Sequence, residues 1–235
     1  MPRTTYLREM QHLQDELVLL ASMVSHALTQ SMIALKRHDR DLSEWLIRHD
    51  KDINAKRYQI ERDCLTLIAT QQPMARDLRF LAGVLEIAGE LERIGDYAKG
   101  IGRIVLRMPP GTLARPIVEI PKMCEKVLDM LRRAQDAYLR LDVAAAYAIP
   151  KEDDEVDELY NRFNREMLEW VRVDPASVDV ANLLMWAAHN IERAGDRVTN
   201  ICERTIYTAT GDLVEVDMNS QSSQPPKATG STGNR

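Results

Sequence analysis

Residues 91–96 read LERIGD, and residues 191–196 read IERAGD. The apolar residues around the two hexapeptides also match at this separation of 100 positions, and those of the preceding segment match at a separation of 103. Chance similarity between two amphipathic helices would not reproduce both the apolar register and a polar hexapeptide. We therefore interpret the chain as an internal duplication. The apolar pairs are Val84/Leu184, Ile87/Ala187, Leu91/Ile191, Ile94/Ala194, Ala98/Val198 and Ile101/Ile201 in the later segment, and Leu46/Ile149, Ile53/Val156, Ile60/Phe163 and Leu67/Trp170 in the earlier one.

Apolar side chains follow a helical period through most of the chain. Over residues 6–34 and 84–105 they recur at alternating steps of three and four, and over residues 46–67 at steps of seven. A narrow apolar stripe of this kind is typical of long helices that pack side by side. Proline and glycine cluster between the two repeats. We therefore predict an all-α protein of two tandem homologous three-helix bundles, with long antiparallel helices, over residues 3–108 and 115–210.

The composition excludes several classes of protein. The 235 residues carry a formal net charge of -5 and show no basic stripe, so we expect no nucleic-acid partner. The three cysteines lie far apart, which favours a reduced cytosolic protein over a disulfide framework or a zinc site. Residues 17–35 carry no formal charge, but six polar residues interrupt them, so we predict a core helix and not a membrane span. Residues 218–235 are polar and low in complexity, and we predict that they are disordered.

Each hexapeptide carries two carboxylates four residues apart. These are Glu92 and Asp96 in the first repeat and Glu192 and Asp196 in the second. On a helix this spacing places both carboxylates on one face, one turn apart. Because the apolar stripe faces the core, we expect both pairs on the exterior of the bundles.

The preceding helix carries a matching acidic pair. In the second repeat Asp153 and Asp157 are four residues apart, and their first-repeat counterparts are Asp50 and Asn54. Like charges at this spacing repel each other, and a second acidic helix alongside adds to the repulsion. We therefore expect a positively charged group near these carboxylates that offsets their negative charge.

Two explanations for the offset remain open: the neighbouring Arg93 and Arg193, or a bound cation. The hexapeptide glycines, Gly95 and Gly195, each stand in mid-helix, where glycine costs about 1 kcal/mol relative to alanine. Repetition of this cost indicates either a close approach of two helices or backbone room beside a ligand. Carboxylates alone favour hard cations such as Mg²⁺, Ca²⁺, Mn²⁺ or Fe³⁺. A further alternative needs no offset at all: the acidic residues form an ordinary solvated helix face.

We find no catalytic constellation in the sequence. No phosphate-binding loop of the form GxxxxGK[ST] and no GxSxG elbow is present. The inward Glu-x-x-His signature of di-iron bundles is missing; His189-x-x-Glu192 is that motif reversed, and the counterpart of its histidine is Gly89. We therefore predict a binding module that is not an enzyme, with a carboxylate-bridged metal store or oxidase as the competing class.

The paired hexapeptides resemble the PhoU family, whose members have two three-helix halves. Further matches are the segments PMARDLR at residues 73–79 and DDEVDELY at residues 153–160, and the resemblance covers residues 5–212. It implies a cytoplasmic protein that reaches the inner membrane only through partners. It also implies a negative regulator of the phosphate-starvation response and of phosphate uptake. The implied partners are the ATPase subunit of a phosphate ABC transporter, a sensor histidine kinase, and a second copy in a homodimer.

The resemblance also implies metal ions at the acidic motifs, with Fe, Zn, Mg, Mn and Ca as candidates. Because Asn54 is a neutral ligand, we expect the first-repeat cluster to bind metal more weakly than the second. The implied ligands are Glu92, Asp96, Glu192, Asp196, Asp153, Asp157 and Asp50 with Asn54.

Overall fold

The computed structural model describes residues 3–109, 111 and 117–216. Within these residues the regular structure is helical throughout, which confirms the all-α prediction. The segment predicted to be disordered, residues 218–235, lies outside the described part of the chain. The elements are α1 (Arg3–Arg37), α2 (Arg40–Gln71), α3 (Arg76–Arg107), α4 (Glu119–Arg140), α5 (Val143–Ala148), the 3-10 helix η1 (Ile149–Glu152), α6 (Asp153–Val173), the 3-10 helix η2 (Pro175–Ser177) and α7 (Val178–Thr210).

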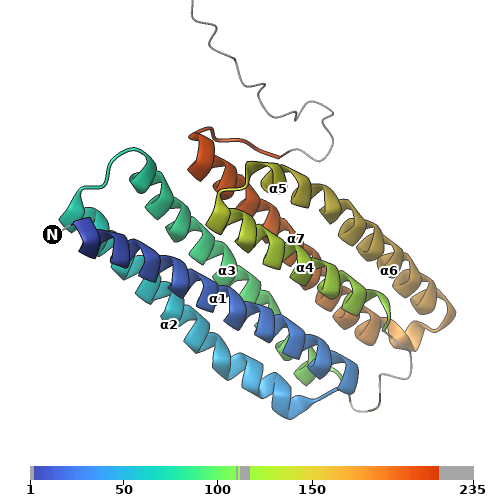
Figure 1. Cartoon of the computed structure of the whole chain (residues 1–235). Coiled ribbons are helices and arrows are strands. Elements are labelled where there is room, and N and C mark those ends of the chain that lie inside the picture. The colour runs from blue at the N-terminus through green and yellow to red at the C-terminus, as the bar shows by residue number, and fades with distance from the viewer. Residues whose placement is uncertain (1–2, 110, 112–116, 217–235) are drawn as a thin grey trace, which may run out of the picture.

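The first half consists of three long helices joined by two tight turns (Figure 1). Asp39 caps α2, because its side chain accepts a hydrogen bond of 2.9 Å from the backbone N–H of Leu42. Gln72 ends α2 in the left-handed conformation, with a φ of 49°. Short turns of this kind force consecutive helices to run antiparallel.

The second half has three long helices and an additional short one that the sequence analysis did not predict. Leu141 ends α4 in the left-handed conformation, and the side chain of Asp142 then caps the six-residue helix α5. Pro150 follows at the start of η1, where its missing N–H is not needed. This local capping chemistry turns the connection between α4 and α6 into a short helical segment.

The two halves meet along α3 and α7, which pack more extensively against each other than any other pair of helices (Figure 1). The two helices are antiparallel, because Gly83 lies against Thr208 while Tyr97 lies against Arg193. A Cβ atom on Gly83 would lie 2.5 Å from the Thr208 hydroxyl, so glycine permits the close approach. The buried apolar residues of both halves form one continuous core.

Among the described residues, one helix is long and apolar enough, by length and composition alone, to cross a membrane: Thr4–Arg37 of α1, in which an 18-residue window has a mean hydropathy of 1.5. Half of that window is buried inside the bundle. Leu17, Leu20 and Leu28 are at most 2% exposed. Helix α1 therefore contributes its apolar side chains to the core of the first half, as we predicted from the polar residues that interrupt this stretch.

Candidate metal-binding site

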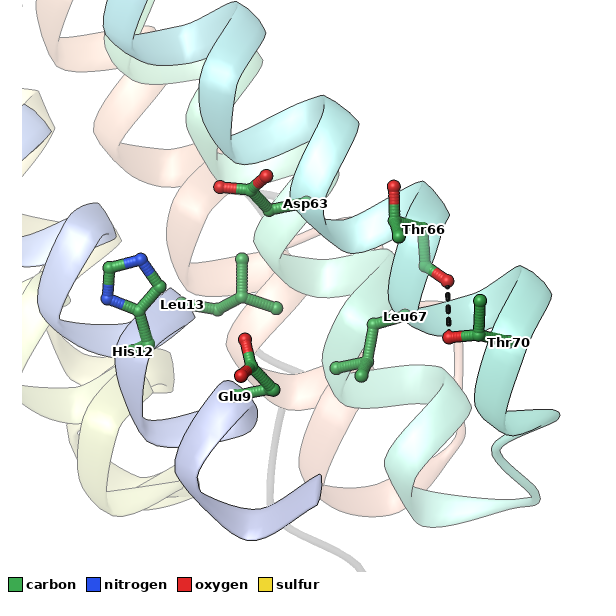
Figure 2. Close-up of a pocket in the computed structure, with 7 residues that line it drawn as sticks. All are labelled: Glu9, His12, Leu13, Asp63, Thr66, Leu67 and Thr70. Atoms are coloured by element: carbon green, nitrogen blue, oxygen red, sulfur yellow. Dashed lines mark hydrogen bonds between the residues drawn. The ribbon is translucent and has the colours of Figure 1, made fainter. Parts of the chain in front are cut away.

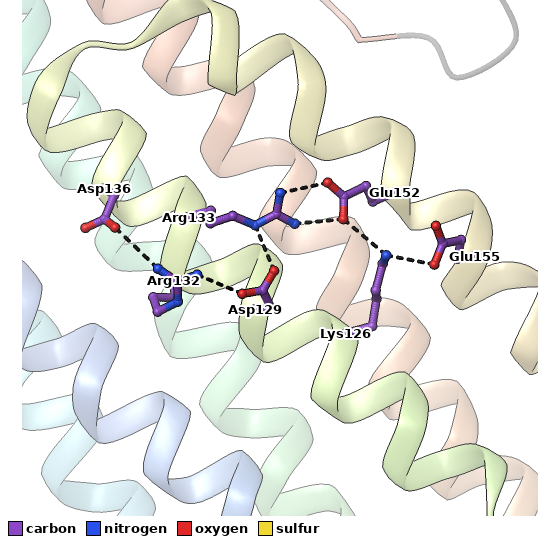
Figure 3. Close-up of polar contacts among 7 residues, drawn as sticks. All are labelled: Lys126, Asp129, Arg132, Arg133, Asp136, Glu152 and Glu155. Carbon is purple, nitrogen blue, oxygen red and sulfur yellow. Dashed lines mark hydrogen bonds and ion pairs between the residues drawn. The ribbon is translucent and has the colours of Figure 1, made fainter.

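The acidic run at the start of α6 divides into two faces. Glu152 accepts two hydrogen bonds of 2.7 Å from the guanidinium of Arg133 on α4 (Figure 3). Lys126, also on α4, lies 3.1 Å from Glu152 and 2.7 Å from Glu155. The hydrogen bonds from Arg133 lower the pKa of Glu152 to about 2. The α4 face of the run is therefore neutralised within the protein.

The other face of the run points to α7 and has no such cation. Asp153 is 2% exposed, and no described residue donates a hydrogen bond to its Oδ1 atom. Burial, followed by the charges of Asp157, Asp196 and Glu192, raises the pKa of Asp153 to about 7. A buried carboxylate surrounded by other carboxylates is costly unless a cation or a proton compensates for it.

Gly195 gives this carboxylate its place against α7. A Cβ atom on Gly195 would overlap the Oδ1 atom of Asp153. Its counterpart Gly95 has a different neighbour, since a Cβ atom there would lie 3.1 Å from the Cδ1 atom of Ile53. Gly95 therefore allows a close approach of two helices, one of the two predicted explanations, and Gly195 leaves room for the carboxylate of Asp153.

The α7 carboxylates complete the cluster. Glu192 is half-buried, and burial followed by the charge of Asp196 raises its pKa. Burial followed by the charge of Asp196 likewise raises the pKa of Asp157. The Nδ1 atom of His189 lies 3.1 Å from the Oε2 atom of Glu192. We call Asp153, Asp157, Glu192 and Asp196 the second-half cluster.

In the first half, a lysine lies among the corresponding acidic residues. The ammonium of Lys99 on α3 donates to Oδ2 of Asp50 at 2.7 Å and to Oδ1 of Asp96 at 2.5 Å. Asn54 donates to the same Asp50 oxygen at 3.1 Å. Burial lowers the pKa of Lys99, but the hydrogen bonds to the two carboxylates outweigh it and raise the pKa. At the separation of 100 positions, the counterpart of Lys99 is Thr199. We call Asp50, Asn54, Glu92 and Asp96 the first-half cluster.

The clusters lie deeper than the sequence analysis expected. The four hexapeptide carboxylates are half-buried, and their mates Asp50 and Asp153 are only 7% and 2% exposed. Glu92 has a raised pKa, first through burial and then through the charge of Asp96. The hexapeptide carboxylates, which the sequence analysis expected on the exterior, are thus partly covered, and Asp50 and Asp153 are buried because the helices pack closely.

The two hexapeptide arginines do not offset this charge. Arg93 pairs with Glu90 at 2.5 Å, and the guanidinium of Arg193 lies over the ring of Tyr97, 5.2 Å from its centroid. Lys99 performs this role in the first half, and the sequence analysis missed it. Comparing basic as well as acidic positions between the two repeats would have exposed the difference between Lys99 and its counterpart.

The donor atoms of the second-half cluster are chemically suited to a hard cation. Oxygen donors, an unpartnered buried carboxylate oxygen and uncompensated negative charge are what such a cation requires. Among the described residues, no three His, Cys, Asp or Glu side chains stand close enough together to enclose a metal ion as they lie. The carboxylates would therefore have to draw together around a bound cation. The first-half cluster does not fit in the same way, since an ammonium bridges two of its carboxylates.

A hollow of about 320 Å³ between α1 and α2 is a separate feature (Figure 2). Asp63 on its wall lies thirteen residues beyond Asp50, which is about 20 Å along a helix. The hydroxyls of Thr66 and Thr70 donate to backbone carbonyls four residues earlier, so their protons are not available to a ligand. The hollow is lined by Glu9, His12, Leu13, Asp63, Thr66, Leu67 and Thr70.

Comparison with known proteins places the chain. Residues 17–105 and 120–205 each match the family model of the PhoU domain. The chain belongs to the PhoU family. The double match also confirms the internal duplication, with one PhoU domain in each half.

Relatives of known name extend over most of the chain. It is 34% identical to the phosphate-specific transport system accessory protein PhoU homolog of Clostridium acetobutylicum, over 92% of this chain and 100% of that protein. It is 30% identical to the phosphate-specific transport system accessory protein PhoU of Escherichia coli, over 86% of this chain and 84% of that protein. The crystal structure of the phosphate transport system regulatory protein PhoU from Streptococcus pneumoniae superposes with a TM-score of 0.83 at 28% identity, covering 89% of this chain and 99% of that chain.

Proposed function

We propose that the chain is an accessory protein of phosphate transport and a negative regulator of phosphate uptake and of the phosphate-starvation response. It acts without catalysis, as a cytoplasmic homodimer that links the ATPase subunit of a phosphate ABC transporter to a sensor histidine kinase. The observation that carries the proposal is the match of both halves to the PhoU domain, together with relatives named for phosphate-specific transport.

The second-half cluster adds a metal-dependent element to this role. Asp153 and Asp157 from α6 and Glu192 and Asp196 from α7 are the residues that would hold a cation. The cation would supply positive charge between two acidic helices and fasten them together. Support comes from the unpartnered Oδ1 atom of Asp153, which is buried with three other carboxylates around it.

Through this link between α6 and α7, a bound metal would affect how the protein binds its partners. With α6 and α7 held together, the outer surface of the second half is fixed in one arrangement. Without the cation, repulsion between the carboxylates weakens the packing of the two helices. The regulatory state of the protein then depends on metal in the second half.

Co-purification from cells grown at high and low phosphate tests the adaptor role. We expect the transporter ATPase and the histidine kinase to be recovered with the wild-type chain, and less of both with Asp153→Asn. The matched control is Asp154→Asn, because Asp154 is exposed in the same acidic run. Recovery of neither partner at either phosphate level would remove the adaptor role. Equal recovery with Asp153→Asn would remove the metal link and leave the adaptor.

The competing class, a metal store or oxidase, gives a different result. An iron-loaded oxidase consumes oxygen when Fe²⁺ is added, and a store retains many iron atoms per chain. We expect oxygen consumption by the wild-type chain to equal that of Asp153→Asn. Consumption that depends on Asp153 would overturn the non-enzymatic proposal.

A further inference from the structure

We propose that Lys99 is a built-in cation that replaces metal in the first half, so that metal fastens helices only in the second half. The inference rests on the proposed metal-binding role of the second-half cluster. Lys99 joins α2 to α3 permanently, whereas the link between α6 and α7 depends on a bound ion.

The geometry of Lys99 is that of a bridging ion. Its side chain is 17% exposed and connects Asp50 on α2 to Asp96 on α3, with hydrogen bonds of 2.7 and 2.5 Å. Hydrogen bonds between an ammonium and carboxylates are about twice as strong as those between neutral groups. Two of the three ammonium protons are therefore used to hold the two helices together.

The backbone positions of the two clusters correspond, and the difference lies in the side chains. The Oδ1 atoms of Asp50 and Asp153 are both buried and unpartnered, as expected for equivalent residues of a duplication. On the other oxygen, Asp50 receives Lys99, whose counterpart Thr199 is too short and carries no charge. The buried hydroxyl of Thr199 makes no hydrogen bond with any described residue.

The charges of the two clusters differ accordingly. The first-half cluster has three carboxylates, because Asn54 is neutral, and Lys99 supplies one positive charge among them. The second-half cluster has four carboxylates, and within the described residues its ion-pair contact is with His189 and with no lysine or arginine. A divalent cation therefore finds more negative charge in the second half.

A metal ion entering the first half would also meet direct competition. It would have to displace an ammonium held by two carboxylates or share the cluster with it. Two positive charges at this close distance repel each other strongly near a protein surface. The lysine therefore excludes metal as well as replacing it.

Exchange of the lysine for its second-half counterpart tests the inference. Mn²⁺ alone is the probe, with the full chain, and bound Mn²⁺ is measured by equilibrium dialysis with elemental analysis. We expect wild-type binding to be lost in Asp153→Asn/Asp157→Asn. We expect Lys99→Thr to bind about twice the wild-type amount at saturation, because it frees a second set of carboxylates. Asp96→Asn added to Lys99→Thr removes the gain.

The matched control is Lys56→Thr. Lys56 is also a half-buried lysine that joins two helices, with its Nζ atom 2.6 Å from Oε2 of Glu16 and its side chain 18% exposed. It contacts neither cluster, so Lys56→Thr binds Mn²⁺ as the wild type does. This control separates loss of a bridging lysine in general from loss of the one among the carboxylates.

Amide hydrogen exchange on the wild-type chain gives a second measurement that needs no variant. Mn²⁺ should slow exchange in α6 and α7 and leave α2 unchanged. Slowed exchange in α2, or wild-type binding without any gain in folded Lys99→Thr, would overturn the role of Lys99 while the second-half metal site stands. A wild-type chain that binds no Mn²⁺ would overturn the second-half metal site and this inference together, and would leave the adaptor role untouched.

Discussion

Two helix junctions correspond in the duplication: that of α2 with α3 and that of α6 with α7. They differ in how their negative charge is compensated. In the first, Lys99 lies between Asp50 and Asp96. In the second, Asp153 is equally buried but has no lysine or arginine as a partner among the described residues. The two junctions share their backbone positions and three of the four acidic positions, and they differ at Asn54 against Asp157 and at Lys99 against Thr199. The comparison shows that equivalent carboxylates in two repeats can have different charge partners.

The largest effect is expected where the cores of the halves differ. Ile94 is fully buried, and its counterpart is Ala194, also fully buried. Ile94→Ala gives the first half the smaller residue but not the surrounding packing, so we expect the free energy of unfolding to fall by about 3 kcal/mol. Urea denaturation measures it. A change below about 0.5 kcal/mol, the size typical of surface substitutions, would mean that the two cores are interchangeable.

Removal of the built-in cation should come next. In metal-free buffer, Lys99→Thr leaves Asp50 and Asp96 uncompensated, and we expect a loss of about 2 kcal/mol in the free energy of unfolding. The loss is smaller than for a fully buried pair because the groups retain some contact with water. Thermal denaturation with and without Mn²⁺ measures it. If the variant is as stable as the wild type in chelator, the ammonium does not fasten the helices.

The opposite sign is expected for Asp153→Asn in metal-free buffer. The folded protein holds the Asp153 proton up to a pKa of about 7, well above the ordinary value of 3.8. The free energy of unfolding of the wild type therefore falls as the pH rises from about 4 to about 7. The amide cannot ionise, so the variant should gain about 2 kcal/mol over the wild type at pH 8 and nothing at pH 4. Equal stability of the two proteins at pH 8 would show that Asp153 is compensated by another group.

Glu152, the residue next to Asp153, should respond to pH in the other direction. Its pKa is lowered to about 2 by Arg133, so the pair stabilises the protein fully above pH 4.5 and loses this effect as the pH falls toward 2. We expect Arg133→Met to cost about 1 kcal/mol at pH 7, because the pair is partly exposed to solvent. The cost should shrink between pH 5 and pH 3. Urea midpoints across this range measure it, and a cost that stays constant with pH would separate Arg133 from the ionisation of Glu152.

The helical architecture could be predicted from the sequence because a repeated apolar period constrains each helix locally. The acidic positions of α3 and α7 followed from the same register. The short helix α5 was not predicted, since it depends on the left-handed Leu141 and the cap from Asp142 and not on any apolar period. Local turn chemistry of this kind has a weak signal in a single sequence.

The compensation of charge could not be predicted because it depends on which side chains reach across between helices. Lys99 stands three residues after Asp96, and its position in the sequence does not reveal that its ammonium also reaches Asp50 on another helix. Arg193 stands beside an acidic residue in the sequence but lies on Tyr97 of the other half. The burial of Asp153 likewise follows from the close packing of α6 against Gly195.

The most direct test of the difference between the two junctions is anomalous diffraction from crystals of the wild-type chain grown with Mn²⁺. We predict anomalous density between α6 and α7, beside Asp153 and Glu192, and none beside Lys99. Density at both junctions, or beside Lys99 alone, would contradict the account.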